Sequence, residues 1–323
     1  MTGAVVALGG GHGLYHSLTA LRGLTEDLTA VVTVADDGGS SGRLRHEMGI
    51  VPPGDLRMAL SALCGDTEWG TTWRDVLQWR FTTDGPLDGH ALGNLLIAAL
   101  WDRSGDVVEG LEWVARLLQA HGRVLPVSEE PLTVCAELET DSGVDVVRGQ
   151  VAVATAHGRV KSLSLEPAEP RVPAATLTAI AEADAVVLGP GSWYTSVLTH
   201  FCVAPVAAAL VAASARTTVI LNVGDDDVET AGMSRVDDIR ALRTAAPDFV
   251  PAEVVVDTSH ADDPGLRDEI AQWGPQLVEA DVRDHHHAHA HDPIRLRETL
   301  RQVLASRTSW AMTKHAGGSG PAR

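Results

Sequence analysis

The chain begins with a glycine-rich turn between an apolar segment and an amphipathic segment. Residues 4–8 are all apolar, which is typical of a buried parallel strand. Residues 9–13 follow as Gly-Gly-Gly-His-Gly, and leucines at helical spacing then continue to Leu24. A strand, a glycine turn and a helix in this order direct main-chain N–H groups and the positive end of a helix dipole toward an anion. The segment therefore predicts an α/β fold with a phosphate-type site, although tight turns also use glycine for structural reasons alone.

A second loop of this kind follows the next expected strand, residues 28–35. Two carboxylates, Asp36 and Asp37, come first, and paired carboxylates suit ribose hydroxyls or a hard divalent cation such as Mg²⁺. The following residues offer amides, hydroxyls and a guanidinium group that suit an oxyanion: Gly39, Ser40, Ser41 and Arg43. A phosphorylated ligand, with or without a metal, is favoured over a solvated polar turn.

A third loop repeats the design after the apolar residues 185–188. It carries Gly189, Gly191 and Ser192 before an expected helix. In an open parallel sheet, loops at the carboxyl ends of neighbouring strands converge near the topological switch point. The glycines of the first loop do not match the dinucleotide pattern G-x-G-x-x-G, which disfavours a nicotinamide dehydrogenase.

Two further segments carry polar residues beside apolar helices. Asp55 is expected to cap a helix over residues 56–64, which places Arg57 in its first turn near the same pocket. His90 and Asn94 lie at the start of a strongly apolar helix. They need hydrogen-bond partners there, and a structural role and a ligand contact are equally compatible with the sequence.

The length of 323 residues allows one large α/β domain or two small ones. Residues 1–308 are predicted to form a single domain with a parallel sheet. Short alternating strands at about residues 122–166 predict a small antiparallel insertion, and residues 309–323 are expected to be a flexible tail.

Charge and composition narrow the class of protein. The net charge of −18 opposes binding to nucleic acid and to anionic lipid, so any phosphate must be held in a local pocket. The three cysteines are odd in number and widely separated, which indicates reduced thiols and a cytoplasmic protein. No signal peptide or membrane-inserting segment is expected. The histidines of residues 285–291 and the acids of residues 225–229 are interpreted as an adventitious metal binder and a solvated loop.

Five motifs together resemble the YvcK-type gluconeogenesis factor family. They are residues 9–14, 34–45, 52–57, 90–96 and 188–196. The resemblance implies a Rossmann-like three-layer fold with helices on both faces of the sheet, and a cytoplasmic protein that binds a nucleotide-sugar, typically a UDP-sugar. That family is linked to central carbon metabolism, cell shape and cell-wall synthesis, with no settled catalytic activity. It is related to the phospholactate transferase of deazaflavin cofactor biosynthesis, which uses a guanosine nucleotide and magnesium.

Carried over residue by residue, the resemblance implies a ligand pocket lined by Gly10, Gly11, His12, Gly13, Asp36, Asp37, Asn94, Gly191 and Ser192. The sequence departs from the family pattern at His12, where many members have threonine, and at His200, where many have asparagine. It also has Met233 and Ala290 where members carry an aromatic residue and an arginine.

Two hypotheses follow from these motifs. The first is a regulator that binds a nucleotide-sugar and acts through an unidentified protein partner, with self-association open. The alternative is a magnesium-dependent transferase of a phosphorylated group, with Asp36 and Asp37 holding the metal.

Overall fold

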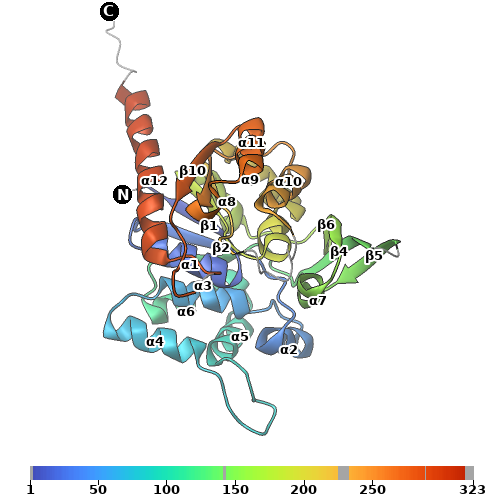
Figure 1. Cartoon of the computed structure of the whole chain (residues 1–323). Helices are drawn as coiled ribbons and strands as arrows, with labels where there is room; N and C mark the ends of the chain where they lie inside the picture. The colour runs from blue at the N-terminus through green and yellow to red at the C-terminus, as the bar shows by residue number, and fades with distance from the viewer. Residues whose placement is uncertain (1–2, 141–142, 225–232, 288, 317–323) are drawn as a thin grey trace, which may run out of the picture.

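A seven-stranded parallel sheet organises the protein. The chain is shown in Figure 1 as a computed structural model, which describes residues 3–140, 143–224, 233–287 and 289–316. The strand order of the sheet is β10-β9-β8-β7-β1-β2-β3, and each pair of neighbours runs parallel. The strands are β1 (Val5–Gly9), β2 (Leu28–Val32), β3 (Arg123–Pro126), β7 (Ala185–Leu188), β8 (Thr217–Ile220), β9 (Glu253–Asp257) and β10 (Gln276–Ala280). The predicted α/β fold is confirmed.

Helices cover both faces of this sheet. In Figure 1, α1, α3 and α6 lie on one side and α8 and α9 on the other. The helices are α1 (Gly11–Leu21), α2 (Gly39–Met48), α3 (Gly54–Leu63), α4 (Glu68–Gln78), α5 (Leu92–Ser104), α6 (Val107–Leu118), α8 (Ala174–Glu182), α9 (Ala204–Ala212), α10 (Arg235–Ala245), α11 (Pro264–Trp273) and α12 (Pro293–Ala316). Short helical turns add η1 (Trp193–Val197), η2 (Leu198–Cys202), η3 (Ser214–Arg216) and η5 (Thr258–His260).

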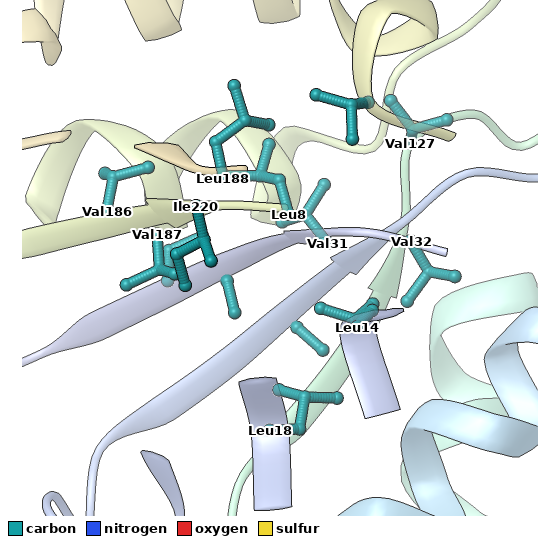
Figure 2. Packing of buried hydrophobic residues seen from close by; sticks show 14 of the residues in the cluster. Leu8, Leu14, Leu18, Val31, Val32, Val127, Val186, Val187, Leu188 and Ile220 are labelled. Atoms are coloured by element: carbon teal, nitrogen blue, oxygen red, sulfur yellow. The ribbon is translucent and has the colours of Figure 1, made fainter. Parts of the chain in front are cut away.

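The core lies between the central strands and these helices. Figure 2 shows Leu8 of β1 among the side chains of β2, β7 and β8, with Leu14 and Leu18 of α1 below them. All three leucines are at most 1% exposed, and burial of such a side chain contributes about 1.5–3 kcal/mol. Continuous apolar strands are what a sheet covered on both faces requires.

The antiparallel insertion is smaller than expected. It contains β4 (Thr133–Thr140) between β5 (Gly143–Arg148) and β6 (Arg159–Glu166). Assigning residues 124–127 to it was wrong, because β3 pairs in parallel with β2 in the main sheet. The strand expected over residues 144–153 ends at Arg148. Residues 150–155 form the short helix α7 (Gln150–Thr155), whose Val151 N–H donates to Asp37 Oδ1 at 3.0 Å.

The last helix is longer than expected. α12 continues to Ala316, because no proline or glycine interrupts residues 294–316; of the predicted tail, residues 317–323 lie outside the described part. No single helix of the described residues is long and apolar enough to cross a bilayer. Within the described ranges, one bent pair, Trp193–Cys202 and Ala204–Ala212, passes that test jointly, with 88° between its halves.

Candidate functional site

A cleft of about 460 Å³ lies at the carboxyl ends of β1, β7 and β8. The chain continues from β1 to β2 on one side, while β7 flanks β1 on the other, so the cleft lies at the switch point of the sheet. It is lined by Gly10, Gly11, His12, Gly13, His16, Asp55, Gln150, Pro190, Gly191, Ser192, Ser196, Asn222, Gly224, His289, Ala290 and His291. The first and third glycine loops thus share one cleft, as their positions after parallel strands predicted.

The two glycine loops pack directly on each other. A methyl group on Gly13 would lie 2.2 Å from the carbonyl oxygen of Pro190 and 2.5 Å from the α carbon of Gly191. A methyl group on Gly10 would lie 2.6 Å from Asp55 Oδ2. Only glycine permits these approaches, so main chain, not side chains, forms much of the cleft wall.

The amino end of α1 faces this cleft. Its N-cap residue, Gly10, provides no side-chain acceptor, and the first N–H groups of a helix have no partner within the helix. His12 and Gly13, in the first turn, line the cleft. An anion placed here receives main-chain N–H groups and the positive end of the helix dipole.

The third loop is fixed to the neighbouring strand by an asparagine. Gly191 N–H donates to Asn222 Oδ1 at 3.0 Å, and Asn222 Nδ2 donates to the Gly191 carbonyl at 2.9 Å. Ser17 of α1 donates to the Gly189 carbonyl at 2.9 Å. These bonds hold the loop so that Ser192 and Ser196 line the cleft.

Asp55 supplies a buried carboxyl group to the cleft. The expectation that it caps its helix was wrong, because α3 begins at Gly54 with Pro53 as N-cap, and Asp55 falls in the first turn. Its carboxyl accepts the Gly11 N–H, and among the described residues Oδ2 has no hydrogen-bond partner. Burial, followed by the charge of Asp36, raises the pKa of Asp55 to about 7. Such a group needs a proton or a cation when an anion binds beside it.

The carboxylates of Asp36 and Asp37 diverge. Asp36 accepts the Gly38 N–H at 3.0 Å and a bond from Ser41, while burial raises its pKa. Asp37 instead accepts the Val151 N–H of α7. The carboxyl group whose charge acts on Asp55 is therefore that of Asp36, so Asp36 and Asp55 are the pair that suits a divalent cation. No cluster of three or more histidine, cysteine or acidic side chains suited to a metal occurs within the described ranges.

Several predicted site residues form a polar network behind the cleft. Ser40 Oγ lies 3.0 Å from His90 Nδ1 and accepts from Asn94 Nδ2 at 3.0 Å. Arg57 Nε donates to Asn94 Oδ1 at 2.9 Å, and its other end bonds Gln78. This network joins α2, α3, α4 and α5, so its members support the loops and do not line the cleft.

The remaining predicted residues lie in different places. Ser41 accepts the Gly54 N–H at 2.6 Å, and Gly39 opens α2 with a φ of 48°. Arg43 donates to the carbonyls of Pro86 and Asp88, at 3.2 and 2.6 Å, outside the cleft. His200 is 1% exposed, and burial lowers its pKa to about 4, so it is a neutral core residue.

Comparison with known proteins identifies the family of this chain. The family model described as "2-phospho-L-lactate transferase CofD" matches residues 5–305. The chain belongs to the CofD family. A Mycobacterium tuberculosis (strain ATCC 25618 / H37Rv) protein named "Putative gluconeogenesis factor" is 44% identical over 313 residues, covering 94% of this chain and 91% of that protein. The "Gluconeogenesis factor" of Bacillus subtilis (strain 168) is 38% identical over 238 residues, covering 74% of this chain and 73% of its own.

The fold of this CofD-family protein matches a solved structure. A member of the upf0052 family from Bacillus halodurans superposes with a TM-score of 0.82 at 31% identity, covering 92% of this chain and 99% of that one. The resemblance drawn from the five motifs is thereby confirmed.

The CofD-family cleft also contains residues that the motifs did not indicate. Asn222 lies two residues after the end of β8. Polar residues that follow a parallel strand commonly face the site at that edge of the sheet, so the sequence position could have indicated it. Gln150 arrives from the insertion, and His289 and His291 from the segment before α12. His291 Nε2 lies 3.1 Å from the Leu221 carbonyl, and burial lowers its pKa to about 4.

Two positions at which the sequence departs from the family pattern lie in different cavities. Ala290 lines the cleft, whereas Met233 contacts the hydroxyl of Tyr194 at 3.7 Å in a separate cavity. The acidic residues 225–229 lie outside the described part of the chain.

Proposed function

We propose that this CofD-family protein is a cytoplasmic regulator that binds a UDP-sugar and links it to carbon metabolism, cell shape and cell-wall synthesis through a protein partner. The names of its relatives support the metabolic link. The observation that carries the ligand class is the cleft in which the amino end of α1 opposes the loop after β7.

The construction of this cleft suits a diphosphate more than a neutral ligand. Glycines expose main chain on two sides, and the helix dipole favours negative charge. Its volume of about 460 Å³ lies within the range of about 300–1,000 Å³ usual for small-molecule sites. Because the whole chain carries a charge of −18, attraction for a phosphate must come from this local arrangement.

A second candidate is a magnesium-dependent transfer of a phosphorylated group. The buried carboxyl group of Asp55 beside Asp36 favours this candidate. A divalent cation between the two carboxyl groups and a phosphate would neutralise the negative charge on each side. Asp36 and Asp55 would hold the metal, which would neutralise charge on the phosphate.

Thermal unfolding separates the two candidates. UDP-glucose, UDP-N-acetylglucosamine, GDP and GTP are each added with and without Mg²⁺, since a bound ligand raises the melting temperature by mass action. A metal-independent shift with a UDP-sugar supports the regulator, and a magnesium-dependent shift with a guanosine nucleotide supports the transferase. Absence of a shift with all four contradicts both.

A matched pair of variants assigns the shift to the cleft. Gly13→Ala is expected to remove the shift by forcing the loops apart. Gly85→Ala is the control, because a methyl group there meets only Thr83 Oγ1, at 3.8 Å. A ligand shift retained in Gly13→Ala would place the nucleotide elsewhere.

A further inference from the structure

A second cavity, of about 550 Å³, lies between the antiparallel insertion and α10. β6 packs against η2 on its inner side, and α10 forms the opposite wall. Among the described residues, none lines both this cavity and the nucleotide cleft. The loop after β7 lies between the two: Tyr194 faces the second cavity, whereas Ser192 and Ser196 face the cleft.

The inner part of this cavity is apolar. Leu163, Leu198 and Phe201 contribute hydrocarbon, and Ala241 lies on the α10 side. Cys202 adds a thiol whose pKa is raised to about 11 by burial, so it stays neutral. A ligand with an apolar body would displace water from these side chains, and the burial of apolar surface favours its binding.

Cations gather at the same cavity. Arg159 and Lys161 of β6 and Arg240 of α10 line it. Arg240 pairs with Glu269 at 2.9 Å, whereas within the described part of the chain neither Arg159 nor Lys161 forms an ion pair. Lys161 therefore remains available to an anionic group, whereas the charges of Arg159 and Arg240 also act on Asp237.

A β-bulge places one of these cations. The pairing of β4 with β6 shifts so that Glu137 lies opposite Ser162 and Leu138 opposite Val160. Lys161 is thus the extra residue, and bulges commonly redirect a side chain at a binding site.

Two acidic groups also line the cavity. Asp237 is held in the capping box of α10, where it accepts the Ser234 N–H at 2.9 Å, which lowers its pKa. Glu139 lies opposite Arg159 in the sheet register. With Asp237 occupied by the helix end and Glu139 beside Arg159, Lys161 has the least compensated charge.

We propose that this cavity binds a small amphipathic anion, with an aryl or short acyl body on Leu163 and Phe201 and a carboxylate, sulfonate or phosphate group at Lys161 and Arg159. The site is separate from the nucleotide cleft and independent of the function proposed for it. A molecule of this kind would be a second ligand of the protein.

The probe is 8-anilinonaphthalene-1-sulfonate, which joins aromatic rings to one sulfonate. Its fluorescence is titrated against the full chain, with near-UV circular dichroism to show native packing, because partly unfolded protein also binds this dye. One saturable site is expected, from which octanoate displaces the dye. Absence of saturable binding to native protein would overturn the proposal.

Charge-matched variants locate the dye. Lys161→Glu is expected to weaken binding about tenfold, through loss of a charge-assisted contact. Arg103→Glu, an equal charge change on the exposed face of α5, outside this cavity, is expected to leave binding unchanged. If both variants weaken dye binding equally, or if neither weakens it, the assignment of the dye to this cavity is wrong.

A filling variant and a cleft variant complete the test. Ala241→Phe is expected to remove dye binding while UDP-sugar shifts persist, and Gly13→Ala is expected to do the reverse. If Ala241→Phe does not fold, the pair Lys161→Glu and Arg103→Glu still decides. Dye fluorescence tests the second cavity and the thermal shift tests the nucleotide cleft. Either proposal can therefore fail while the other stands.

Discussion

Gly13 in the first turn of α1 lies so close to Pro190, in the loop after β7, that a methyl group would come within 2.2 Å of the Pro190 carbonyl oxygen. The cleft between these two loops depends on this approach, because it sets the spacing of the two walls. Gly13→Ala is therefore expected to destabilise the protein by about 1–3 kcal/mol, as overpacking does, measured by denaturant unfolding. A fully stable Gly13→Ala protein would show that the loops separate without strain.

Asp55 predicts an unusual dependence of stability on pH. Its pKa of about 7 in the fold exceeds the ordinary aspartate value of 3.8, so the folded state binds more protons between these values. Stability should fall as pH rises from about 4 to about 7. Asp55→Asn removes this penalty and is expected to be more stable than the natural protein at pH 8 by roughly 1–3 kcal/mol.

The comparison is made by thermal unfolding at pH 8 and near pH 4, where the carboxyl is protonated and the advantage should vanish. Asp84→Asn, at an exposed loop position, is the control for the loss of one negative charge. A loss of stability at pH 8 in Asp55→Asn would show that the ionised carboxylate is already compensated in the fold.

The sequence predicted the cleft better than its lining. Glycine turns after apolar strands indicate where loops meet, because parallel strands end at one edge of a sheet. The directions of neighbouring side chains depend instead on tertiary contacts. Asp36 turns toward Ser41 and Asp37 toward α7, and nothing local distinguishes two successive aspartates.

The sequence also did not indicate contacts between residues that lie far apart along the chain. Arg43 follows the second loop directly, yet it bonds the carbonyls of Pro86 and Asp88, which the sequence separates from it by more than forty residues. His291 reaches the cleft from the far end of the chain. The packing of α12 against α1 brings the segment before α12 to this part of the fold. No sequence periodicity predicts that contact or the bonds of Arg43.

Buried histidines predict acid sensitivity. Burial lowers the pKa of His200 to about 4, below the ordinary histidine value of 6.5, so the unfolded state binds more protons between these values. Stability is therefore expected to be lost as pH falls from about 6.5 to about 4. His200→Asn, which cannot titrate, should lose less stability over this window, by on the order of 1–3 kcal/mol.

Melting temperatures at pH 7 and pH 4.5 measure this difference. His46→Asn, at an exposed position on α2, provides the control and should follow the natural protein. Identical slopes for His200→Asn and the natural protein would show that His200 does not titrate on unfolding in this range.

Asp37 is predicted to act on the ligand through the insertion. Its carboxylate accepts the Val151 N–H at the start of α7, and α7 also carries Gln150, which lines the cleft. Asp37→Ala should cost about 1 kcal/mol, the usual effect of losing a helix cap, and should speed hydrogen exchange in residues 150–155. Asp145→Ala, on the exposed strand β5 of the same insertion, is the control and should leave that exchange unchanged. If Asp37 acts instead by contacting the ligand directly, Asp37→Ala will weaken nucleotide binding without altering hydrogen exchange in α7. That result would contradict the prediction.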